Sequence, residues 1–144
     1  MPLASTRVLH ANWSAHHRPV AQGAMTAQCT ITSPGTVSGW DPVTGPTAAL
    51  PPVVFYTGPC RVQSRVARAG EADAAGQPVT RRPYLVAIPA VSADIPVTAR
   101  VHMDACAGDL HLAGKTLTVA DVVYAAERFE RDLTCTLDLT NQEA

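Results

Sequence analysis

The sequence predicts a mainly β protein: a small antiparallel β-barrel or sandwich with long loops and a short N-terminal helix. About seven or eight short runs alternate apolar and polar residues, and turn residues separate them, as in barrels and sandwiches. Twelve prolines and nine glycines leave few windows long enough for a helix, which disfavours a helical bundle. Only 5% of the residues are aromatic, so Val, Leu, Ile and Ala must build the core. We find no internal repeat and no parallel βαβ pattern.

The segment 5–22 is the early helix candidate. Its apolar residues recur at helical spacing, and Ser5 or Thr6 could cap its start. Pro19 should limit it, because a proline pushes the preceding residue out of the α region. The apolar face would consist of Leu9, Trp13 and His16.

Strand-like alternation begins at Gln28 and continues until Pro34-Gly35. A second run covers 53–57, where β-branched and aromatic residues are concentrated. We expect Gly58-Pro59 to interrupt it before alternation resumes over 60–66. There the predicted inward residues are Cys60, Val62 and Val66, and the outward ones are Arg61, Gln63 and Arg65.

The second half of the chain supplies the remaining strands. Tyr84 to Ile88 form a run that Pro89 ends, and 97–103 alternates cleanly. Short runs at 110–112 and 116–119 flank a Gly114-Lys115 turn, whereas 121–129 fits either a strand or a helical turn. The predicted inward residues are Val97, Ala99, Val101, Met103, Leu117, Val119, Leu133, Cys135, Leu137 and Leu139.

Two long connections divide the β region. Residues 34–52 are rich in proline and glycine, and Asp41 to Gly45 read as a turn. Residues 64–80 form the second connection, which is rich in alanine and glycine and lacks regularly spaced apolar residues. A loop of this length is uncommon in compact domains unless it is functional. We therefore divide the chain into an N-terminal helical arm, 1–24, and a β-barrel domain, 25–144.

Composition limits the classes of function. Eleven basic residues against twelve acidic ones give a net charge of −1, which argues against a general nucleic-acid coat. The 47% hydrophobic fraction is enough to bury a core. No run reaches the roughly 18 apolar residues of a membrane span. Polar residues interrupt the first 18 residues, so we expect no secretory signal.

The four cysteines are widely spaced. Because no CxxC pair exists, neither a zinc ribbon nor a thioredoxin-like motif is indicated. We expect reduced thiols, several of them as small core residues, and no cofactor. They are Cys29, Cys60, Cys106 and Cys135.

Catalytic motifs are missing from the sequence: it has no GxSxG, P-loop, HExxH or Rossmann glycine pattern. A hairpin could bring the pair His102 and Asp104 near the pair Asp109 and His111, and imidazole with carboxylate suits a divalent cation. A solvated hairpin is the favoured reading of these four residues. A triad of Ser64 with His102 and Asp104 lacks an oxyanion motif and is disfavoured.

Five of the eleven basic residues lie within 22 positions, around the 64–80 connection. With Glu71 and Asp73 the stretch keeps a net charge of +3, so it could contact phosphates without sequence specificity. A solvated basic face explains it equally well. No aromatic residues are interleaved, which argues against single-strand binding. The five residues are Arg61, Arg65, Arg68, Arg81 and Arg82.

Several segments in order carry a family resemblance. A Cys29-Thr30-Ile31 strand follows the helix, and a turn over 40–45 comes next. The stretch Tyr56-Thr57-Gly58-Pro59-Cys60-Arg61-Val62-Gln63 is the most specific part. Segments 114–119 and 131–135 complete the order. The sequence thus resembles the head-to-tail connector proteins of tailed phages and prophages, in particular the head-closure or stopper proteins of actinobacterial siphophages, over most of 25–140.

The resemblance implies a non-enzymatic virion protein, made in the host bacterial cytoplasm, that forms a homo-oligomeric ring in the neck. Such a ring contacts portal and adaptor on one side and tail terminator or tail tube on the other, without a membrane, and helps to retain packaged double-stranded DNA. The arginines around 64–80 become candidates for the DNA channel. Trp40, Asp41, Pro42 and Gly45 become candidates for ring or partner contacts.

Two alternatives stay open. The protein could form a neighbouring ring, as an adaptor or a tail terminator. It could instead be a small metal-dependent hydrolase that uses His102, Asp104, Asp109 and His111.

Overall fold

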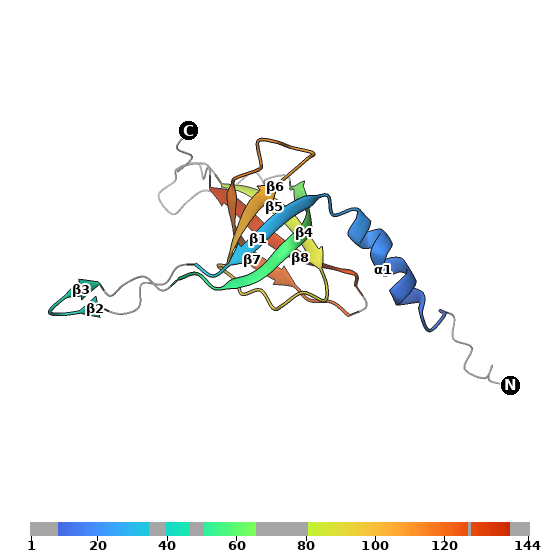
Figure 1. Ribbon diagram of the computed structural model, residues 1–144, viewed down its shortest axis with the longest axis horizontal. Helices are drawn as coiled ribbons and strands as arrows, with labels where there is room; N and C mark the ends of the chain where they lie inside the picture. Colours follow the sequence, from blue (N-terminus) through green and yellow to red (C-terminus); the bar gives the residue numbers. More distant parts are fainter. Residues whose placement is uncertain (1–8, 35–39, 47–50, 66–80, 127, 139–144) are drawn as a thin grey trace.

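A computed structural model describes residues 9–34, 40–46, 51–65, 81–126 and 128–138. It confirms the mainly β prediction: strands close into an antiparallel barrel with a helix beside it (Figure 1). The elements are α1 (Trp13–Gly23), β1 (Ala27–Thr32), β2 (Trp40–Asp41), β3 (Gly45–Pro46), β4 (Val54–Ser64), β5 (Arg81–Pro89), β6 (Arg100–Ala105), β7 (Thr116–Val123) and β8 (Glu130–Asp138). Among the helices of the described segments, none has both the length and the apolar character that a membrane crossing requires.

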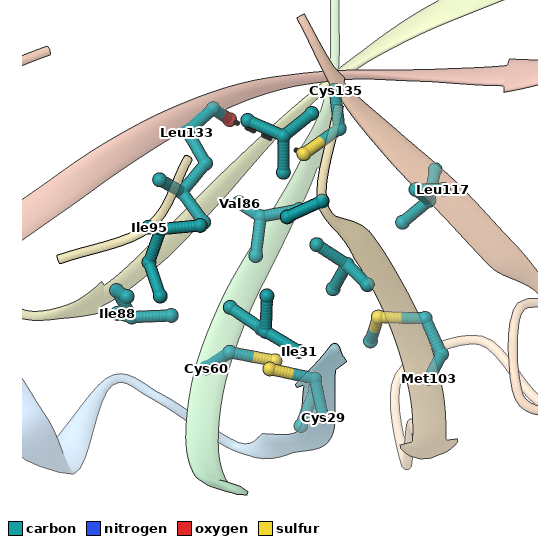
Figure 2. Packing of buried hydrophobic residues seen from close by; sticks show 14 of the residues in the cluster. Cys29, Ile31, Cys60, Val86, Ile88, Ile95, Met103, Leu117, Leu133 and Cys135 are labelled. Atoms are coloured by element: carbon teal, nitrogen blue, oxygen red, sulfur yellow. Dashed lines mark hydrogen bonds between the residues drawn. The ribbon is translucent and has the colours of Figure 1, made fainter. Parts of the chain in front are cut away.

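The barrel has the strand order β1-β4-β5-β8-β7-β6 and closes through a β1–β6 pairing. Alternate residues of each strand point inward, where they form one apolar cluster (Figure 2). The inward predictions for Ala99, Val101, Met103, Leu117, Val119, Leu133, Cys135 and Leu137 are confirmed, as all eight are buried. Leu139 and Val66 lie outside the described residues.

The ladder between β4 and β5 stops at two prolines. Its register runs from Ser64 opposite Tyr84 to Arg61 opposite Ala87, which brings Pro59 opposite Pro89 at the next bonded position. Arg65 donates its N–H to the carbonyl of Pro83 at 3.0 Å, so from Thr57 onward the odd-numbered residues of β4 direct their backbone groups toward β5. The pair of prolines has no N–H to exchange, and the ladder ends there.

Both carbonyls at this point are bonded in another way. The Tyr56 hydroxyl donates to the carbonyl of Pro59 at 2.7 Å. Ser92 donates its N–H at 3.0 Å and its hydroxyl at 2.6 Å to the carbonyl of Pro89. Side chains and a turn thus replace the missing ladder bonds, because buried carbonyls need a donor.

Beyond the barrel, β1 and β4 continue together as a two-stranded arm. Ser33 donates its N–H to the Val53 carbonyl at 2.8 Å, and its hydroxyl accepts the Val53 N–H at 2.9 Å. The hairpin of β2 and β3 forms a separate two-stranded sheet, which Figure 1 shows standing clear of the barrel. We call the segment 33–53 the arm. The turn predicted over Asp41 to Gly45 is confirmed, with Gly45 at a φ of +82°.

Three features of the N-terminal helix differ from prediction. The helix begins at Trp13, and Pro19 lies inside it rather than ending it. The chain continues to Gly23 because a proline removes only one N–H and the last helical turn still forms its own bonds. Leu9 precedes the helix, and the proposed caps Ser5 and Thr6 lie outside the described residues. No residue of α1 is buried.

Three strand predictions were also wrong. Gly58-Pro59 does not interrupt β4, because β1 pairs along that side of the strand. The run 97–103 begins only at Arg100, since Thr98 has a φ of +77° in a turn that leaves Val97 51% exposed. Residues 110–112 form turns that bury only Leu112. The first part of the ambiguous 121–129 segment is strand, because β7 continues past a bulge to Val123. Residues 124–126 are not part of a strand.

Gly58 is required where β4 bends. Its φ is +156°, and a Cβ added there would lie 2.9 Å from the Tyr56 hydroxyl oxygen. We expect Gly58→Ala to lower the free energy of unfolding by about 1–3 kcal/mol, through backbone strain and displacement of that hydroxyl from Pro59. Urea unfolding measures the change. Gly108→Ala is the matched control, because nothing lies within 4 Å of its added Cβ, and it should be nearly neutral. Equal stability of the two variants would contradict this role.

Candidate functional site

Three of the predicted arginines lie at the end of the barrel opposite the arm. Arg65 follows the last residue of β4, and Arg81 and Arg82 begin β5. All three side chains are exposed, and no ion pair involves them within the part of the chain that the structure describes. Arg68 lies outside the described residues. The structure therefore brings together an exposed basic rim where the 64–80 connection meets the barrel.

Arg61 does not belong to that rim. It lies on the outer face of β4 and forms an ion pair with Glu130 of β8, at 2.5 Å between Nη2 and Oε2. A second pair, Arg128 with Asp132 at 2.6 Å, lies beside it. Glu130 and Asp132 keep only 14% of their side-chain surface exposed. The Arg61 charge is thus neutralised within the protomer, and Arg61 supports the wall of the barrel rather than offering a free cation.

The four ring-contact candidates form the tip of the arm. The backbone of Trp40 pairs with that of Pro46, and Asp41 pairs with Gly45. Pro42 is exposed in the connecting turn. The turn that the sequence predicted over these residues is thus confirmed, whereas the arm that carries it depends on the β1–β4 pairing. Their role in ring or partner contacts stays a prediction.

The proposed metal and triad residues do not converge. His102 Nδ1 lies 3.1 Å from the Thr116 hydroxyl, and Asp104 accepts a bond from the Thr30 hydroxyl at 2.7 Å. Asp109 accepts the N–H of His111 at 3.0 Å, in a turn of its own. Within the described segments, no three His, Cys, Asp or Glu side chains are grouped as metal ligands. Ser64 ends β4 and has no contact with His102 among the recorded hydrogen bonds of those segments.

Three cysteines line the barrel interior. Cys29 and Cys60 come from adjacent strands, and Figure 2 shows their sulfurs facing each other. Contact with Cys60 and burial together raise the pKa of the Cys29 thiol. Burial raises the pKa of Cys135 to about 12. All four thiols are free, as predicted, and Cys106 is the half-buried one. The buried thiols act as small apolar core groups.

A loop cluster that the sequence did not reveal closes the arm end of the barrel. The Arg131 guanidinium donates to the carbonyls of Ala93 at 2.7 Å and of Ser92 and Ala90 at 3.2 Å. The Cζ atom of Arg131 lies over the ring of Tyr124, 5.5 Å from the ring centroid. The Tyr124 hydroxyl donates a hydrogen bond to Asp94, which raises the pKa of Tyr124. A pocket of about 270 Å³ beside them is lined in part by Ala90, Val123, Tyr124 and Arg131. Its polar side chains are engaged by protein groups, so they fasten the 90–94 loop.

The other feature that sequence reasoning missed is an edge of backbone on β4. Between Val54 and Pro59, β1 is the one strand of the described segments that pairs with β4, because the β5 ladder begins at Arg61. The exposed side chains of Val53 and Val54 adjoin this edge, at 59% and 57% exposure. Pro59 and Pro89 were both visible as breaks in the sequence, but only the register sets them opposite each other.

Comparison with known proteins identifies a family and a similar fold. The profile of a family of unknown function, DUF6093, matches residues 17–136. A search of curated proteins gave no match. The fold is similar to the solution structure of protein SF1141 from Shigella flexneri 2a, with a TM-score of 0.51 and 18% identity over 82% of this chain and 96% of that one. At that identity the similarity concerns the fold alone.

The buried thiols predict a loss of stability in alkaline solution. The pKa of Cys135 is higher in the folded protein than its ordinary value of 9.0, so the folded state holds the proton more tightly. The protonated thiol therefore contributes to the free energy of unfolding, fully below about pH 9. The contribution is lost as pH rises toward 12, and the free energy of unfolding then falls by up to about 1.4 kcal/mol per pH unit. Urea unfolding at each pH should show a shallower decline for Cys135→Ala. Parallel curves for the two proteins would contradict the assignment.

Proposed function

Because the chain belongs to the DUF6093 family, whose function is unknown, we propose a role from its geometry: a structural subunit of a phage neck. In this proposal it forms the stopper ring that joins portal and adaptor to the tail and helps to retain packaged DNA. The protein acts through the partners that it contacts.

The arm is the observation that carries the proposal. The β1–β4 ribbon leaves the barrel at Ser33 and Val53, and the hairpin at its tip stands clear of the protomer (Figure 1). An extension that buries little of its own protomer gains stability when it contacts a neighbour. Interfaces in which one subunit's extension meets a different surface of the next are heterologous, and they form a ring when the rotation between subunits closes.

The basic rim supports the second part of the proposal. Strand β4 has 11 residues, so at about 3.3 Å per residue its two ends are about 30 Å apart or somewhat more. The arm leaves from one end, and Arg65, Arg81 and Arg82 lie at the other. A protomer of this shape can contact its neighbours with one end while directing exposed guanidinium groups to phosphates with the other.

Removal of the protein from its phage tests the proposal. We expect particles that lack it to have full-sized heads, no attached tails and partial loss of DNA, since nothing would close the portal. Electron microscopy and DNA content per particle provide the readout. Tailed particles with normal DNA content would contradict the proposal, and heads already carrying a neck ring but lacking tails would favour a tail terminator.

The basic rim allows a separate test. Combined replacement of Arg65, Arg81 and Arg82 by Gln should leave the thermal unfolding midpoint within a few degrees, because the three side chains are exposed. Particles that carry this variant should attach tails but lose DNA faster when external salt is lowered, because fewer phosphates are neutralised. Replacement of the exposed Arg100, on the β6 wall, is the control. Equal DNA retention by all three particles would contradict a channel role for the rim.

A further inference from the structure

The free edge of β4 directs backbone groups away from the barrel. From Thr57 to Arg65, odd-numbered residues face the β5 side, as the bond from Arg65 to Pro83 establishes. The bulge between Val54 and Tyr56 reverses this order, so the backbone of Val53 bonds to Ser33 on the β1 side. Toward the start of β4, the first residue before Pro59 whose backbone groups face the β5 side is Thr57. Its N–H and C=O therefore point to the side that β5 has left, while Gly58 and Tyr56 bond to β1. An unpaired strand edge is a template for a strand from another chain.

This edge lacks the charged side chains that often block strand addition, and one bulge, opposite Ile31 and Thr32, interrupts its pairing with β1. The residues from Val53 to Thr57 carry no charge, and Val53 and Val54 are more than half exposed. Prolines bracket the stretch, with Pro52 before it and Pro59 after it. Because proline cannot donate to a ladder, the edge accepts a short strand of defined position.

The hairpin at the arm tip also has an unpaired strand edge, and it needs further contacts to be stable. A hairpin of two residues per strand, standing clear of the barrel, is too small to be stable in water alone. One of its outer edges contains Pro46 in β3, which lacks an N–H. The other edge, β2, is free of proline, and because backbone groups alternate in direction along a strand, one of Trp40 and Asp41 presents its N–H and C=O outward. In the structure the hairpin stands clear of its own β4 edge (Figure 1).

We propose that β2 of one copy adds as a strand to the Val54–Thr57 edge of β4 in a second copy. The arm of the second copy stays available for a third, so the contact is heterologous and can close a ring. This inference specifies the subunit contact of the proposed neck ring. It concerns self-assembly of the purified protein, which can be measured without the phage.

Two variants each remove one half of the contact. Thr57→Pro deletes the N–H at the free edge, and it should preserve the fold because that N–H has no partner among the described residues. Thr57→Val is its matched control. In the second variant, Asn-Gly replaces residues 34–52. Ser33 and Val53 form a bonded pair, which a two-residue turn can join. Should Thr57→Pro unfold, Val54→Lys blocks the edge with an exposed charge instead.

Sedimentation velocity of the full-length protein should show assembly that strengthens with concentration, and Thr57→Val should match it. Thr57→Pro and the arm-less variant should each stay monomeric at concentrations at least tenfold higher. Mixed together, they should form a heterodimer that grows no further, since one supplies the arm and the other the edge.

The inference would be overturned by a full-length protein that is monomeric at every concentration, by self-association of the arm-less variant through its edges, or by the absence of a complex in the mixture. Full assembly by Thr57→Pro or Val54→Lys would also overturn it. The proposed function fails separately. If the protein assembles and the variants complement as described, yet particles without it are tailed and full, then the contact stands and the neck assignment does not.

Discussion

The structure depends on a proline facing a proline. At the bonded position where Pro59 meets Pro89, neither residue has an N–H, so the β4–β5 ladder cannot pass it. Strand β5 then turns at Ser92, while β4 continues with β1 as its single partner. One missing pair of donors therefore decides which part of β4 belongs to the barrel wall and which part leads into the arm.

The surrounding residues are explained by this constraint. The Tyr56 hydroxyl supplies the donor that the Pro59 carbonyl lacks, and it can do so only because Gly58 has no side chain beneath the ring. Arg131 and Tyr124 fasten the loop into which β5 turns. The barrel is closed around its apolar core, so the departure of β4 exposes backbone at an edge without opening the core.

The sequence predicted the strands of a small antiparallel barrel or sandwich because the signals for strands are local. Alternation of Val101 with His102 and Met103, or of Leu133 with Thr134 and Cys135, depends on neighbours along one strand. The arm, the basic rim and the free edge depend on register between distant strands, which no spacing along the chain encodes. Arg61 shows the same limit: it alternates like Arg65, yet its pairing with Glu130, 69 positions away, withdraws it from the basic rim. Pro19 misled the helix prediction because a short helix can accommodate one missing bond.

Amide hydrogen exchange at Thr57 reports whether the two prolines end the β4–β5 ladder. If the two prolines end the ladder, the Thr57 N–H has no partner in the dilute protomer and should exchange rapidly, whereas that of Gly58, bonded to β1, should be protected. Raising the protein concentration should protect Thr57 as the edge is occupied. Slow exchange at Thr57 in the dilute monomer would show that the edge is already paired, and the account would be wrong.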